Sequence, residues 1–158
     1  MSTVTAAVGV HEVPAATIAL SAIDKPDYAD EFTLHNSGIS AVRAEVWARS
    51  MFGDVPNAAE RFIFQTLLRL RLARNASPET VAGFTITGQT DEWTRLEAHS
   101  PLLTCNLVIQ ARGDRASLAT VMDYSRPRGR ITWQLVSIAH RRLAPGILRE
   151  AAAEVSQP

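Results

Sequence analysis

Hydrophobic and polar positions alternate with two different periods along this chain, and the change of period divides it into segments. In the second half the period is two, and four strand-like runs follow one another: 81–89, 92–100, 102–112 and 116–125. The connections between these runs are short and carry turn-forming residues. Connections of that length join antiparallel neighbours. The pattern therefore predicts an antiparallel meander of four strands.

The segment before the meander predicts one strand and two helices. Phe32 and Leu34 alternate with polar residues, which indicates a strand near 31–35. Residues 39–52 and 58–75 then place apolar side chains at helical spacing, each after a turn or capping residue. Residues 16–23, which precede the strand, are β-compatible, but a run with Pro26 and several aspartates interrupts them.

The two ends of the chain differ in pattern. Residues 1–16 are small, polar and aperiodic, so we expect a flexible N-terminal arm followed by a single domain over residues 17–155. Residues 131–155 have the composition of a long helix. Two faces of this helix are apolar: Trp133, Val136 and His140 on one, and Ile131, Leu135 and Ile138 on another. A helix that is apolar on more than one side is expected to be covered by the sheet.

Composition and charge narrow the classes of protein. The 158 residues carry 16 basic and 16 acidic side chains, a net charge of zero, which argues against a nucleic-acid partner. Acidic residues dominate positions 1–60 and basic residues the remainder, a complementarity that allows a homodimer. No apolar run is long enough for a membrane span, and no secretory signal is evident, so a cytoplasmic location is expected. The single Cys105 and four scattered histidines predict no metal site, and no motif predicts a cofactor.

An antiparallel sheet that curls around a long C-terminal helix, with two helices after the first strand, is a fold of the α+β class called the helix-grip architecture. The chain resembles the START-like superfamily of polyketide cyclases and lipid-transfer proteins, and an uncharacterised bacterial family in or near it. Four segments carry the resemblance: PDYADEFTL at 26–34, VWARSMFGDVP at 46–56, LLRLRL at 67–72 and AHRRLAPGILREAA at 139–152. Members of the superfamily usually have six strands after the helix pair, where this pattern predicts four.

The resemblance implies a ligand site between the concave sheet face and the terminal helix. His140 is the leading candidate there, as a general acid or base or as a hydrogen-bond donor. A core histidine satisfied by a carbonyl or carboxylate is the alternative. Trp133 and Val136 share its helix face, and Met122 and Tyr124 alternate toward the inside on the last strand.

Two further groups of polar side chains are candidates. Trp93, Glu97 and His99 share one face of their strand, which is either a solvated outer face or a polar cavity wall. If the chain is an enzyme, Tyr124 or Glu97 would orient a ligand carbonyl beside His140. The arginines of the turn before the terminal helix, Arg126, Arg128 and Arg130, predict an anion-binding site, because a helix N-terminus already favours anions. A solvated turn is the alternative for these arginines.

Three functions remain open at this point. The leading hypothesis is a protein that holds a hydrophobic or amphipathic small molecule between sheet and helix. The second is an enzyme of the cyclase, dehydratase or isomerase type that acts on a polyketide-like substrate, with His140 as acid or base. The third is a ligand-free dimeric interaction protein.

Overall fold

The computed structural model describes residues 2–53 and 62–157, and in this part of the chain seven strands form one antiparallel sheet in the order β1-β2-β7-β6-β5-β4-β3. The strands are β1 (Thr3–Val8), β2 (Tyr28–His35), β3 (Thr80–Val81), β4 (Phe84–Gln89), β5 (Trp93–His99), β6 (Leu103–Arg112) and β7 (Arg115–Tyr124). The helical segments are α1 (Ala15–Leu20), α2 (Ala44–Phe52), the π-helical turn η1 (Phe62–Leu67) and α4 (Pro127–Val155). The predicted α+β class, with a long C-terminal helix on an antiparallel sheet, is confirmed.

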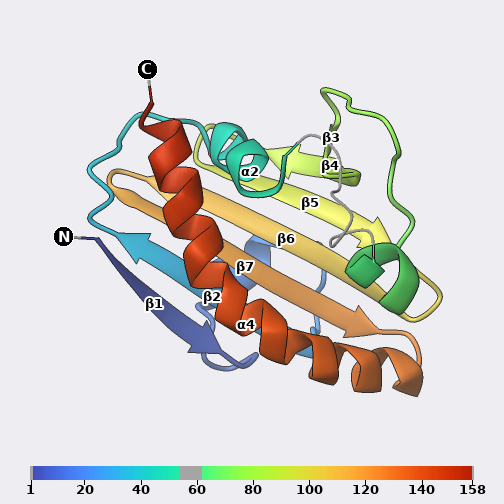
Figure 1. Ribbon diagram of the computed structural model, residues 1–158. Coiled ribbons are helices and arrows are strands. Elements are labelled where there is room, and N and C mark those ends of the chain that lie inside the picture. Colours follow the sequence, from blue (N-terminus) through green and yellow to red (C-terminus); the bar gives the residue numbers. More distant parts are fainter. Residues whose placement is uncertain (1, 54–61, 158) are drawn as a thin grey trace.

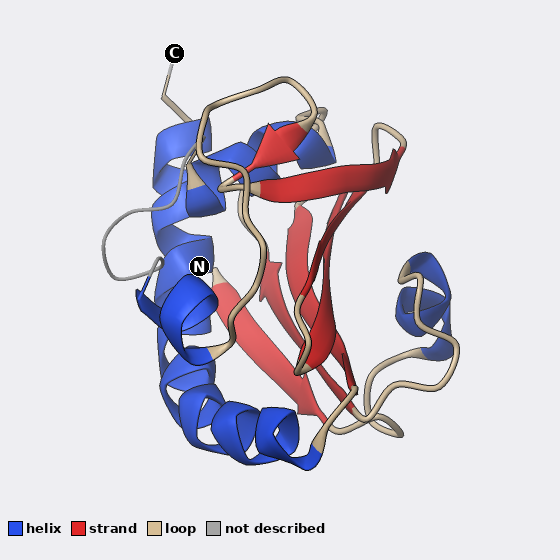
Figure 2. Ribbon diagram, turned by 90° about the vertical axis from the view of Figure 1, so that its right-hand side faces the viewer, coloured by secondary structure: helices blue, strands red, loops and turns tan. Residues whose placement is uncertain are grey.

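The sheet has two faces with different neighbours. Helix α4 runs diagonally across one face, together with α2 (Figure 1). We call this the inner face, and the opposite one the outer face. Helix α1 lies against the outer face (Figure 2), where Ile18 packs beside Val121. The curved sheet is therefore covered by a long helix on one side and by a short one on the other.

Strands β4 to β7 match the four predicted runs, and each pairs with the next along the chain. The tightest connection is between β6 and β7, where Arg112 pairs with Arg115 across the two residues Gly113 and Asp114. Gly113 has φ +58°, a conformation that glycine adopts without steric cost. Burial alternates along β4 and β5, whereas β6 and β7 are buried on both sides over most of their length.

The N-terminal region departs from the prediction. Residues 3–8, placed in a flexible arm, form β1, which pairs with β2 in register from Thr3 opposite His35 to Val8 opposite Asp30. Backbone hydrogen bonds hold an edge strand without any apolar period, so the pattern gave no signal. Residues 15–20 are helical rather than β-like, because the carbonyl of Pro14 accepts hydrogen bonds from Thr17 and Ile18 and starts a helical turn.

The second predicted helix, 58–75, is wrong over most of its described part. Residues 58–61 lie outside the described residues, and 62–67 form only η1. At Arg69 the backbone is left-handed, with φ +57°, and beyond it the chain is no longer helical, with the Arg71 amide donating to the His99 carbonyl at 3.0 Å. Leu68 and Leu70 are buried, whereas Arg69 and Arg71 are exposed. The leucine–arginine alternation has a period of two, and burial of one side decided the conformation.

Helix α4 begins at Pro127, earlier than predicted. Gly129 lies in its first turn, where a Cβ would come within 2.4 Å of the Leu102 carbonyl oxygen, so this close approach requires glycine. Trp133 and Leu148 are buried against the inner face. The prediction that the sheet covers both apolar faces is wrong: Ile131, Leu135 and Ile138 are 59%, 70% and 48% exposed. A single sheet contacts only one side of a helix that lies on it.

Within the described ranges, none of the helices combines the length and the apolar character that a membrane crossing requires.

Candidate functional site

A cavity of about 130 Å³ lies between α4 and the inner face of the sheet. Its walls are mostly apolar side chains from β6, β7, α4 and the segments next to them, among which are Leu107, Leu118, Met122, Trp133, Val136 and Leu143. Two side chains bring strongly polar atoms to this lining, Thr120 from β7 and His140 from α4. The cavity is therefore apolar with one polar end.

The polar end is a network built around Asp30. The side chain of Asp30 is 0% exposed, and its Oδ2 lies 3.2 Å from Nε2 of His140. The hydroxyl of Tyr28 donates a short hydrogen bond to the same carboxylate. Nε2 of His140 also lies 3.2 Å from Oγ1 of Thr120. A buried carboxylate with these partners meets the general requirement that buried charges are paired.

Strand register explains why these groups meet. Tyr28 and Asp30 are two residues apart on β2 and therefore share its inner face. Asp30 pairs directly with Thr120 on β7. His140 reaches the same point from α4, so that its imidazole lies against the cross-strand pair of Asp30 and Thr120.

Aromatic rings fix the orientation of the imidazole. The ring of Trp133, two helical turns before His140, has its centroid 5.4 Å from the imidazole and 5.3 Å from the Tyr28 ring. Phe32 lies edge-on to the imidazole with centroids 6.2 Å apart. The imidazole is thus held by packing as well as by hydrogen bonds, which preorganises it.

Two side chains near the Asp30–His140 dyad keep their protons. Burial and the neighbouring Asp30 carboxylate raise the pKa of Tyr28 above its ordinary value, so the phenol remains a donor to Asp30. Burial also raises the pKa of the Cys105 thiol, which lines the cavity. A protonated thiol is a weak nucleophile, so Cys105 serves as a small apolar wall residue.

The Asp30–His140 dyad supports one kind of chemistry directly. An ionised Asp30 accepts a hydrogen bond from the Nε2–H tautomer of His140, which leaves a lone pair on Nδ1. Such an imidazole can accept or return a proton or bind a ligand hydroxyl.

No group of three or more metal-ligating side chains occurs among the residues that the structure describes.

The sequence analysis named four residues that the structure brings to this cavity: Met122, Trp133, Val136 and His140. Tyr124 lies near the start of α4 and is not among the cavity-lining residues. Its ring packs under the guanidinium of Arg130, at 5.1 Å from the centroid. Burial raises its pKa.

Of the two alternatives for Trp93, Glu97 and His99, the structure shows the outer face, so their assignment to a cavity wall beside His140 is wrong. On β5 the inner positions are the alternating ones between them, since Leu96 pairs with Leu107 of the cavity wall. The three predicted residues therefore lie on the outer face. There, Oε1 of Glu97 and Nε2 of His99 lie 2.6 Å apart, within hydrogen-bond distance. Neither side chain can orient a ligand beside His140.

The three arginines around the start of α4 are exposed. Arg126 occupies the position before the helix, and Arg128 and Arg130 lie in its first turn. Arg130 is 4.0 Å from Asp27, which provides a local carboxylate partner. An anion site at this turn stays a prediction.

Sequence reasoning missed Asp30 and Tyr28, although a signal was present. Phe32 and Leu34 were placed on one side of the strand, and the same alternation continues back through Asp30 to Tyr28. The aspartates around Pro26 were interpreted as an interruption of the strand. A carboxylate at an inward strand position is the feature that would have pointed to a site.

The comparisons add no family to this geometry. Searches of the chain against protein-family models, curated proteins and solved structures found no match.

Proposed function

We propose that this chain is a START-like protein that binds a small hydrophobic or amphipathic molecule between the inner sheet face and α4. The observation that carries the proposal is the apolar cavity with one polar end, formed by His140 and Thr120. A ligand with an apolar body and one hydroxyl or carbonyl matches this lining. The body would contact Leu118 and Val136, and the oxygen would bond with the imidazole.

The size of the cavity limits the ligand. An apolar cavity of about 150 Å³ in an unrelated protein holds one benzene ring. The cavity of about 130 Å³ therefore suits a single ring or a short chain in the arrangement described here. A ligand with several fused rings, as in an aromatic polyketide, would need α4 to move away from the sheet.

p-Cresol is a suitable probe, because it combines one ring with one hydroxyl. We expect Val136→Phe to abolish the binding of p-cresol, measured by calorimetry, since the larger side chain fills the cavity. Leu135→Phe is the matched control: it makes a similar change at the neighbouring position of α4, where the side chain is 70% exposed. Failure of p-cresol to bind, or equal binding by both variants, would refute the proposal. Native mass spectrometry of the purified protein would show whether a small molecule co-purifies.

A second candidate function is supported by the dyad. With Asp30 at 3.2 Å orienting the imidazole, His140 Nδ1 could remove a proton from the carbon next to a ligand carbonyl and return it, as an isomerase or cyclase requires. Cyclohexanone in D₂O tests this step, because the imidazole would exchange its α-hydrogens for deuterium through the enolate. We expect exchange above the buffer rate, which His140→Gln abolishes, whereas p-cresol binding is only weakened because the apolar walls of the cavity remain. If the unmodified protein binds p-cresol but exchange stays at the buffer rate, the binding function stands and the catalytic one is refuted.

A further inference from the structure

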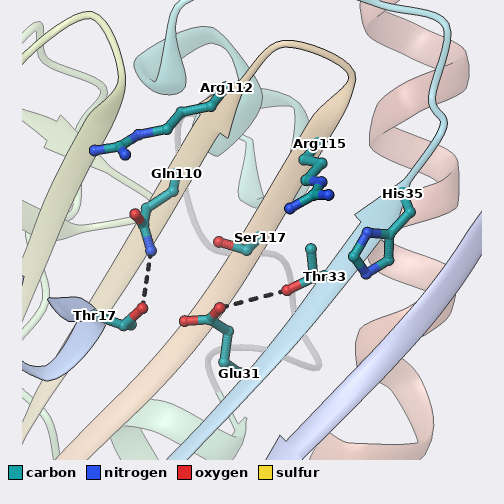
Figure 3. Close-up of a pocket in the computed structure, with 8 residues that line it drawn as sticks. All are labelled: Thr17, Glu31, Thr33, His35, Gln110, Arg112, Arg115 and Ser117. Carbon is teal, nitrogen blue, oxygen red and sulfur yellow. Dashed lines mark hydrogen bonds between the residues drawn. The ribbon is translucent and has the colours of Figure 1, made fainter. Parts of the chain in front are cut away.

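A second hollow, of about 280 Å³, lies on the outer face of the sheet, away from the cavity beside His140. Its floor is formed by β2, β7 and β6, where Thr33 pairs with Ser117 and Ser117 with Gln110. Helix α1 contributes a wall through Thr17, whose hydroxyl accepts a hydrogen bond from the Gln110 amide at 3.1 Å (Figure 3). We call this hollow the outer groove.

The outer groove is charged oppositely at its two ends. Figure 3 shows Arg115 and His35 at one end and Glu31 at the other, with Ser117 and Thr33 between them. Strand register gives the scale. Glu31 pairs with Ala119, four residues from Arg115 along β7, so the two backbones lie ~13 Å apart at ~3.3 Å per residue. Both side chains line the same hollow, so a ligand that contacts both of them must be elongated.

The acidic end contains an oxygen that lacks a donor. Oε1 of Glu31 accepts a long hydrogen bond from the Thr33 hydroxyl at 3.4 Å. Oε2 of the same side chain is buried and has no hydrogen-bond partner among the described residues. A buried carboxylate oxygen without a donor costs more free energy than one that is paired. The Glu31 carboxylate therefore receives little hydrogen bonding from the protein, and its accessible part lines the groove.

The basic end contains an unpaired guanidinium. Arg112 pairs with Glu92 at 3.1 Å. Arg115, opposite Arg112, has no carboxylate within ion-pair distance in the described part of the chain. A carboxylate on a ligand matches the planar donor fork of Arg115. A simple anion would leave the Glu31 carboxylate without a cationic partner. A simple cation would leave the Arg115 guanidinium without a carboxylate.

We propose that the outer groove binds an elongated zwitterion of the ω-amino acid type. The ammonium pairs with the carboxylate of Glu31, the ligand carboxylate accepts from Arg115, and the intervening chain lies over the hydroxyls of Thr33 and Ser117. This site is independent of the function proposed for the inner cavity, because the sheet separates the two.

5-Aminovalerate is the probe, and valerate and pentylamine are its controls, because each keeps one of the two charges. In calorimetry with the full chain at low salt we expect 5-aminovalerate to bind about tenfold more tightly than either control, as two charge-assisted contacts exceed one. Absence of binding, or equal binding by valerate or pentylamine, would overturn the proposal.

Variants locate the site. Glu31→Gln and Arg115→Gln should each weaken 5-aminovalerate binding about tenfold, the loss of one charge-assisted contact. Arg149→Gln removes the same charge from an exposed position of α4 and should leave binding unchanged. Val136→Phe should also leave it unchanged, which separates this site from the inner cavity. Unaltered binding by folded Glu31→Gln would contradict the proposal. If that variant does not fold, the three probes on the unmodified chain still decide.

Discussion

Two histidine–carboxylate pairs lie on opposite faces of the same sheet, and they differ in the property that matters for function. The Glu97–His99 pair on the outer face has the shorter contact, 2.6 Å against 3.2 Å for Asp30–His140. However, the His99 side chain is 61% exposed, whereas that of His140 is 18% exposed and that of Asp30 is 0% exposed. Water screens the first pair and competes for its hydrogen bonds.

Burial, and not distance, therefore distinguishes the two pairs. The inner pair is enclosed by Trp133 and Phe32 and reaches into a cavity. In a site that excludes water, an oriented imidazole interacts strongly with a ligand. A pair on an open face interacts weakly with anything, including its own partner. The comparison predicts that substitutions at the inner pair change stability and ligand binding, and that substitutions at the outer pair change little.

The largest effect is expected from Asp30→Ala. Removal of the carboxylate leaves the Tyr28 hydroxyl and the His140 imidazole without their shared partner in a buried position. We expect the free energy of unfolding to fall by about 4 kcal/mol, a typical cost of breaking a buried pair. Urea denaturation measures it. Glu97→Ala is the control on the outer face, and an equal loss in both variants would show that burial does not separate the pairs.

Leu118→Ala tests the apolar part of the inner face. Leu118 is 1% exposed and lines the cavity, so truncation enlarges a space that the surroundings do not already fill. The expected loss is about 3 kcal/mol, from lost transfer free energy and the added cavity. Thr33→Ala, on the outer side of β2, should cost much less by urea denaturation. A similar loss for both would mean that the two faces contribute equally to stability.

How far the sequence predicted this division depends on how local each signal is. The alternation of β4 to β7 and the helical composition of α4 depend on neighbouring residues, and both elements were predicted. The segment from Leu68 to Leu72 satisfied helical spacing and strand alternation together. The non-helical conformation of this segment depends on contacts distant in the sequence, such as the hydrogen bond of Arg71 with His99. Backbone hydrogen bonds to β2 hold edge strand β1, so this strand forms without an apolar pattern that the sequence could reveal.

The site was predicted in part for the same reason. His140, Trp133 and Val136 share a helix face, which spacing reveals. Asp30 comes into contact with His140 across 110 positions of sequence, and only the pairing of β2 with β7 places it there. For Trp93, Glu97 and His99, alternation shows that they share a face but does not show which face. That choice is made by Leu96 and its neighbours, which pack against the core.

Tyr28→Phe gives a smaller effect that depends on pH. Loss of the hydrogen bond to Asp30 should reduce the free energy of unfolding by about 1.5 kcal/mol near neutral pH. Burial and the Asp30 carboxylate raise the pKa of Tyr28 in the folded chain above the ordinary 10.0. The folded state therefore holds the phenol proton more tightly than the unfolded state, and this stabilisation is lost as the pH rises above the unfolded pKa.

The measurement for Tyr28→Phe is the urea midpoint at neutral pH and again above pH ~10, the ordinary pKa of a tyrosine. Unmodified protein should lose more stability across this interval than the variant. Parallel pH profiles would indicate that Tyr28 ionises as readily in the folded chain as in the unfolded one.

The smallest effect is expected from His99→Gln. The variant removes the contact with Glu97 but leaves both residues accessible to water, so the free energy of unfolding should change by at most about 1 kcal/mol. What little it contributes should shrink further at high salt, because exposed charges are screened. His140→Gln is the matched variant on the inner face, and its effect should persist at high salt, since Asp30 is fully buried. Urea denaturation of both variants at low and high salt gives four values. If the salt dependence were the same for both, the shorter contact of the outer pair, and not the burial of the inner one, would set the strength of the interaction.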